Sequence, residues 1–174
     1  MNSPWVNAIA YQLVWFAAVI GAGRSLAWPG LLAAIAFIVA TLATSRHRAL
    51  DLRLIVVAVL CGVLIDGLCL AFGLVRYAAP MPGPWHFLAP AWILALWAAF
   101  STTLTRSMAW LRPRAWAGAV LGAAGGPLAY LGAARGWGAV TFTSPAWQAL
   151  PALGLGWAMA LALLLWVSRW PMRS

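Results

Sequence analysis

The chain alternates long apolar runs with short segments that carry proline, glycine or arginine. Most runs approach the roughly 20 residues that an α-helix needs to cross a hydrocarbon core of about 30 Å. Trp28-Pro29-Gly30, the stretch 80–84 and Arg112-Pro113-Arg114 punctuate the runs. The pattern predicts an all-α integral membrane protein with a single transmembrane domain over residues 1–174. The bundle of six transmembrane helices is expected near residues 4–22, 29–45, 52–74, 88–107, 115–134 and 147–168.

Composition excludes an ordinary soluble domain. Hydrophobic residues make up 65% of the chain and charged residues 7%, against roughly half and a quarter in soluble proteins. The formal charge is +9, and all 11 basic residues are arginines. They lie between the apolar runs and form no basic stripe, so nucleic acid is not expected as a partner.

The distribution of arginine predicts the orientation, because short cytoplasmic loops retain positive charge. Eight arginines follow even-numbered runs, and three follow odd-numbered runs (Arg24, Arg76 and Arg135). Both termini are therefore expected in the cytoplasm. The small residues at 21–27 leave a cleaved signal peptide as the alternative, with five spans; the lack of a basic residue before the first run favours an uncleaved helix.

Asp66 is the only acidic side chain within a predicted span. A charge inside the membrane costs several kcal/mol unless it is paired or hydrated. Asp66 lies about 21 Å along the third helix from Leu52. This position is in the outer half of the bilayer, on the side where Arg24, Arg76 and Arg135 are expected. We therefore expect it to pair with an arginine, Arg135 or Arg24. Such a pair would either lock helices together or form a proton or substrate site.

Two other segments could surround this carboxyl group. Asn7 and Tyr11 share a face of the first helix beside Gln12, and Gly125-Gly126-Pro127 with Tyr130 interrupts the fifth. They would either line a cavity or form a kink with interhelical hydrogen bonds. The candidate polar intramembrane site consists of Asp66, Arg135, Arg24, Asn7, Gln12 and Tyr130.

Small residues and cysteines have simpler interpretations. Gly118, Gly122 and Gly126 form a smooth stripe that predicts close packing of the fifth helix. Cys61 and Cys69 would lie about 12 Å apart along one helix, too far to form a disulfide.

The chain offers no familiar catalytic or metal-binding set. It contains neither glutamate nor lysine, and its two histidines, His47 and His86, are expected on opposite sides of the membrane. Asp51, beside Arg48 and Arg53, is interpreted as a helix cap with a local ion pair. No catalytic residue, cofactor or metal is therefore expected.

Several stretches resemble an uncharacterised bacterial inner-membrane family, domain of unknown function 2878. They are Asn7 with residues 12–16, 64–66, 90–97, 100–104, 107–111, 125–130 and 132–135. The resemblance implies a bacterial inner (plasma) membrane location and an association with enzymes similar to cyclopropane-fatty-acid synthases. It also places Asp66, Arg135, Asn7, Gln12 and Tyr130 within family-like motifs, and it implies no established activity.

These observations predict an accessory protein in lipid modification or envelope maintenance. Its expected partners are membrane lipids and lipid-modifying enzymes, and a homo-oligomer is left open. The alternative is a small transporter or proton-coupled carrier that uses Asp66. A membrane-embedded enzyme is less favoured, because a single carboxyl group lacks a second catalytic group.

Overall fold

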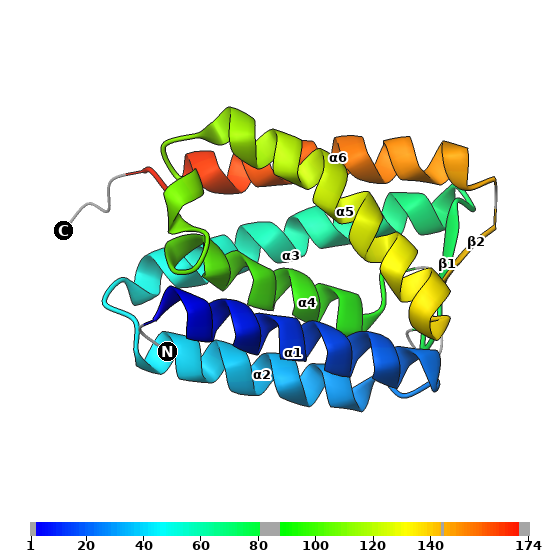
Figure 1. Ribbon diagram of the computed structural model, residues 1–174, viewed down its shortest axis with the longest axis horizontal. Coiled ribbons are helices and arrows are strands. Elements are labelled where there is room, and N and C mark those ends of the chain that lie inside the picture. Colours follow the sequence, from blue (N-terminus) through cyan, green and yellow to red (C-terminus); the bar gives the residue numbers. More distant parts are fainter. Residues whose placement is uncertain (1–2, 81–87, 144, 171–174) are drawn as a thin grey trace.

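The computed structural model describes residues 3–80, 88–143 and 145–170. Within these residues the chain forms six α-helices, two short 3-10 helices and one pair of short strands (Figure 1). The elements in order are α1 (Pro4–Gly23), α2 (Trp28–Ala43), α3 (Arg48–Ala71), β1 (Val75–Tyr77), α4 (Ala91–Ser101), η2 (Thr102–Thr105), η3 (Ala109–Leu111), α5 (Ala115–Trp137), β2 (Val140–Phe142) and α6 (Ala146–Val167).

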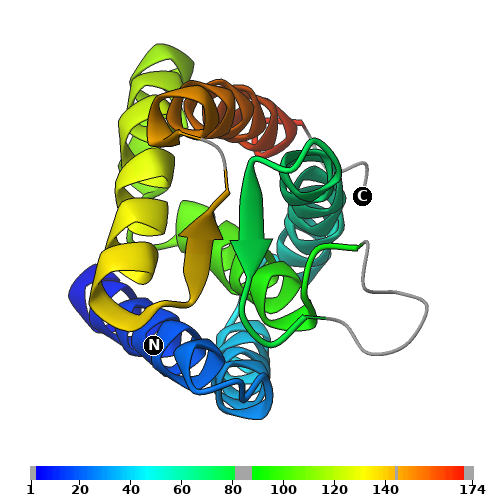
Figure 2. The same ribbon diagram turned by 90° about the vertical axis from the view of Figure 1, so that its right-hand side faces the viewer.

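Successive helices run in opposite directions, so the start of α1 and the end of α6 lie at one end of the bundle and the strands at the other (Figure 1). Seen along the bundle, α4 lies towards the middle (Figure 2). It packs against α1, α2 and α3. Trp92 and Trp97 of α4 are the two largest fully buried side chains. The largest side chains of the core therefore belong to α4.

Four helices, α1, α3, α5 and α6, are long and apolar enough to span a membrane. Their outward faces are apolar as well: Leu60, Leu64 and Leu68 recur every four residues along α3 and are each more than half exposed. Continuous apolar surface of this kind is characteristic of contact with lipid or another apolar partner. The helices α2 and α4 are apolar but shorter.

The fourth helix is shorter than the predicted range 88–107. It begins after Pro90 and gives way at Thr102 to a 3-10 turn. Consecutive hydroxyl groups explain the change, because Ser101, Thr102 and Thr103 each donate to the carbonyl three residues earlier. These bonds compete with regular α-helical pairing. The prediction of one continuous helix to 107 was therefore wrong.

The strand pair was not predicted. β1 and β2 are antiparallel, with Arg76 opposite Thr141 and Tyr77 opposite Val140. Val75 and Tyr77 are buried, whereas Arg76 between them is exposed. Alternation along the strand thus directs Tyr77 into the bundle. The alternation of apolar and polar residues over only three positions is too short to predict a strand from the sequence.

The glycine stripe packs against α6, as predicted. A Cβ atom on Gly122 would lie 2.5 Å from the carbonyl oxygen of Trp157, and one on Gly126 would lie 2.4 Å from the indole Cγ of Trp157. Only glycine permits this approach of the two helices. Cys61 and Cys69 are buried and both free, as their spacing predicted.

We expect Gly122→Ala to lower the free energy of unfolding by about 1–3 kcal/mol, because the new methyl group must displace backbone. Gly125→Ala is the matched control, since its Cβ would meet nothing within 4 Å. Denaturant titration in detergent micelles measures both. Equal stability of the two variants would contradict the packing described for α5 and α6.

Candidate functional site

Asp66 lies at the centre of a buried hydrogen-bonded cluster. Its side chain, on α3, is 0% exposed. Tyr77 donates its hydroxyl hydrogen to Oδ1 at 2.7 Å, and the indole nitrogen of Trp97 donates to Oδ2 at 2.7 Å. Tyr130 also donates to Oδ1. One carboxyl group therefore joins α3, β1, α4 and α5.

The expectation of an arginine partner was wrong for the residues that the structure describes. Both Arg24 and Arg135 are exposed, Arg24 at the end of α1 and Arg135 in the last turn of α5. An arginine in the last turn is favourable because it faces the negative end of the helix dipole. Three neutral donors satisfy the carboxyl group instead, so neither arginine has to leave water.

Tyr77 is the one member of this cluster outside the helices. Burial raises the pKa of its hydroxyl well above the ordinary value, and the nearby Tyr130 and Asp66 raise this pKa further. The hydroxyl therefore keeps its proton at neutral pH and remains a donor to Asp66. This donor could not be found from the sequence, because Tyr77 lies beyond the predicted span.

We expect Tyr77→Phe to lower the free energy of unfolding by about 1 kcal/mol, since one of the three hydrogen bonds to Asp66 is lost. Tyr11→Phe is the control, because the Tyr11 ring packs against Phe37 and Phe100, away from this cluster. Unfolding in detergent measures both variants. A Tyr77→Phe protein as stable as the native one would argue against a structural role for the bond.

The structure separates the remaining predicted residues from Asp66. Asn7 is buried and accepts hydrogen bonds from the backbone and hydroxyl of Ser107 through Oδ1. Its Nδ2 is buried without a partner among the described residues. Gln12 is exposed. Of the six predicted residues, the structure brings together only Asp66 and Tyr130 by direct hydrogen bonding.

A cavity of about 460 Å³ lies between α1, α4, α5 and α6. Its lining is rich in aromatic side chains and also contains leucines, alanines and glycines. The residues most important below are Tyr11, Gln12, Trp15, Trp97, Tyr130 and Trp157. Cavities of roughly this size hold one small molecule or part of a larger one.

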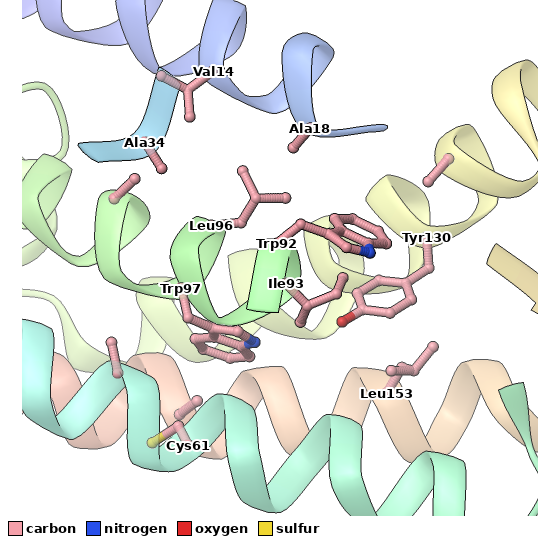
Figure 3. Close-up of a cluster of buried hydrophobic side chains, with 14 of the residues drawn as sticks. Val14, Ala18, Ala34, Cys61, Trp92, Ile93, Leu96, Trp97, Tyr130 and Leu153 are labelled. Atoms are coloured by element: carbon pink, nitrogen blue, oxygen red, sulfur yellow. The ribbon is translucent and has the colours of Figure 1, made fainter. Parts of the chain in front are cut away.

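Trp97 and Tyr130 stand between the cavity and Asp66. Both line the cavity and both donate to the carboxyl group, while Asp66 itself is not among the lining residues. They project from α4 and α5 among other buried hydrophobic side chains (Figure 3). Trp97 also stacks on Trp157, with ring centroids 4.0 Å apart. Asp66 therefore fixes two side chains of the cavity wall.

The mouth of the cavity lies between α1 and α5. Three lining residues are exposed: Gln12 on α1, and Leu121 and Leu128 on α5. Here α5 crosses the bundle obliquely (Figure 1). It is one helix from Ala115 to Trp137, with Pro127 inside it. Gly125 also lines the cavity, and a Cβ atom added to it would meet nothing within 4 Å.

A family model described as "Protein of unknown function (DUF2878)" matches residues 4–163. The chain belongs to the DUF2878 family. No curated protein and no solved structure matched it. The match spans α1 to α5 and most of α6, and so includes the cavity and the Asp66 cluster. With its four membrane-length helices, this DUF2878 chain is a polytopic membrane protein.

A second polar cluster of this DUF2878 chain surrounds Asp51, for which the sequence predicted a helix cap. Asp51 is 0% exposed and accepts hydrogen bonds from Ser45 at 2.6 Å and Thr105 at 2.7 Å. Arg106 is its ion-pair partner at 3.4 Å. Arg48 instead donates to the carbonyl groups of Leu42 and Ala43. Asp51 makes no cap bond; it links α3 to the turn after α4.

No metal centre can be assembled from the described residues. Among residues 3–80, 88–143 and 145–170, no three His, Cys, Asp or Glu side chains lie close enough to hold an ion. His47 precedes the first turn of α3. His86 lies outside the described residues.

Proposed function

We propose that the protein spans the membrane six times, with both termini in the cytoplasm. The start of α1 and the end of α6 lie at the same end of the bundle (Figure 1), which supports this, together with the eight arginines that follow even-numbered helices. α2 has 16 residues, or about 24 Å, which is less than the hydrocarbon thickness of about 30 Å. Local thinning of the bilayer accommodates a short helix at modest cost.

We further propose that the cavity between α1 and α5 binds an acyl chain of a membrane lipid. The observation that carries this proposal is an apolar, aromatic cavity whose exposed lining residues belong to two neighbouring helices. An opening between helices admits a ligand sideways from the bilayer. Lipid tails gain little from leaving one apolar medium for another. Selectivity would therefore come from the fit against rings such as Trp15 and Trp157.

The chemical character of the lining favours binding over catalysis. Among the described residues, the lining contains no carboxyl group, histidine, cysteine or arginine. A reaction on the bound chain would therefore need groups from another protein. We propose that the chain acts as an accessory protein, holding a lipid for a lipid-modifying enzyme of the bacterial inner membrane. The association that the family resemblance implies fits this role.

Lipid mass spectrometry of cells that lack the protein tests this role. Complementation with the native chain should restore the acyl-chain species that change in the deletion, whereas Gly125→Leu, which fills the cavity, should not. Gly136→Leu, on the same helix at an exposed position outside the lining, is the matched control. An unchanged lipid profile in the deletion would rule out the accessory role.

A proton-coupled carrier is the second candidate. Tyr130 favours it, because this one residue both lines the cavity and donates to Asp66. A proton could then pass between the carboxyl group and the cavity through the hydroxyl group. This function predicts pH-dependent flux in proteoliposomes that Asp66→Asn abolishes. Flux that is independent of pH, or unaffected by the substitution, would exclude it.

A further inference from the structure

A second cavity, of about 410 Å³, lies at the end of the bundle where α1 begins and α6 ends. The start of α1, the connection between α2 and α3, and the turn after α4 enclose it. Its lining is polar and basic, in contrast to the cavity between α1 and α5. The lining residues are Pro4, Thr44, Ser45, Arg46, His47, Thr105 and Arg106.

The charge of this cavity is not neutralised by the described part of the chain. The sequence has only two acidic residues, Asp51 and Asp66. Asp51 is already paired with Arg106, and Asp66 lies in the cluster towards the strand end of α3. Arg46 is exposed, and no described carboxyl group lies within ion-pair distance of it. The cavity therefore has a net positive charge, carried by Arg46, which favours binding of an anion.

One wall of the cavity is held rigidly. The guanidinium group of Arg106 donates to the backbone carbonyl of Thr41 at 2.8 Å and to the hydroxyl of Thr105 at 3.0 Å. With the ion pair to Asp51, these bonds leave its side chain only 14% exposed. A planar guanidinium fixed in this way loses little freedom when it meets a planar or tetrahedral anion.

A neighbouring tryptophan supports a position of the cavity near the depth of lipid headgroups. Trp5 follows the lining residue Pro4 and is 80% exposed. Exposed tryptophans gather at the boundary between hydrocarbon and water. Anionic lipids are concentrated on the cytoplasmic side of membranes, where basic clusters bind them.

We propose that this cavity binds the phosphate group of an anionic phospholipid through Arg46, His47 and Arg106. The phosphate oxygens accept hydrogen bonds from the arginines, and His47 contributes a further donor. Inorganic phosphate shares this chemistry. The site is separate from the acyl-chain cavity, and it rests only on the proposed cytoplasmic position of this end of the bundle.

Native mass spectrometry of the full chain released from nanodiscs of mixed phosphatidylglycerol and phosphatidylcholine tests the site. We expect Arg46→Gln/His47→Gln to lower the retention of phosphatidylglycerol about five-fold or more. The control Arg114→Gln removes an exposed arginine from the same end of the bundle, outside the lining, and should retain the lipid. Arg46→Gln alone replaces the double variant if the latter does not fold.

Added inorganic phosphate separates the two sources of the ligand, with chloride at equal ionic strength as the reference. A lipid site predicts that phosphate leaves the retained phosphatidylglycerol unchanged. If phosphate displaced phosphatidylglycerol, and this displacement required Arg46 and His47, the binding site would stand but its ligand would be a soluble anion. Equal retention of both lipids, or equal loss in Arg114→Gln, would overturn the proposal.

Discussion

Asp66→Leu is expected to lower the free energy of unfolding by at least about 3 kcal/mol, because it leaves three buried donors without an acceptor. The hydroxyl groups of Tyr77 and Tyr130 and the indole N–H of Trp97 all point at this carboxyl group. Unfolding of the purified protein in detergent micelles measures the loss.

Asp66→Asn separates hydrogen bonding from charge. The amide oxygen can accept from Trp97, and the amide nitrogen can donate to a tyrosine oxygen. We therefore expect a loss of only about 1 kcal/mol. If Asp66→Asn were as unstable as Asp66→Leu, the negative charge itself would be required, contrary to the structural role described here.

Gly125→Leu has the largest expected effect on ligand binding. Open space surrounds this glycine in the wall of the cavity, so a leucine side chain can enter without displacing backbone. It would occupy volume that the acyl chain needs, and we expect retention of the lipid to fall about ten-fold. This corresponds to about 1.4 kcal/mol. Native mass spectrometry of the protein released from nanodiscs measures the retained lipid.

Gly136→Leu is the matched control for this prediction. The same side chain enters the same helix, near its exposed end and away from the lining. It should leave lipid retention unchanged. If both variants lost the lipid equally, the effect would come from changes in α5 as a whole and the cavity would not be the binding site.

The sequence predicted the number and approximate positions of the helices, because long apolar runs have few other structural solutions. The predicted first helix, 4–22, differs from Pro4–Gly23 by a single residue. The third begins at Arg48, four residues before the predicted start. The predicted span followed the apolar run, and the polar residues of the first turn of α3 precede this run. Asp51 was therefore interpreted as a cap at the start of the helix.

The candidate site was harder to predict. Asp66 was identified because a carboxyl group in an apolar run must be satisfied, and Tyr130 because it follows the Gly-Gly-Pro segment. The other two donors to Asp66, Tyr77 and Trp97, are 11 and 31 residues from Asp66 in the sequence. Tertiary packing brings these residues together. Asn7 matched the expected pattern of a polar intramembrane residue, yet it bonds Ser107 instead.

The central claim is that an acyl chain occupies the cavity between α1 and α5. Photocrosslinking with a fatty acid that carries a diazirine on its chain tests it most directly in reconstituted protein. We predict saturable labelling of residues 11–19 and 121–133, which unlabelled fatty acid suppresses and Gly125→Leu abolishes. Labelling that does not saturate and falls equally on outward residues such as Leu60 and Leu64 would contradict the claim.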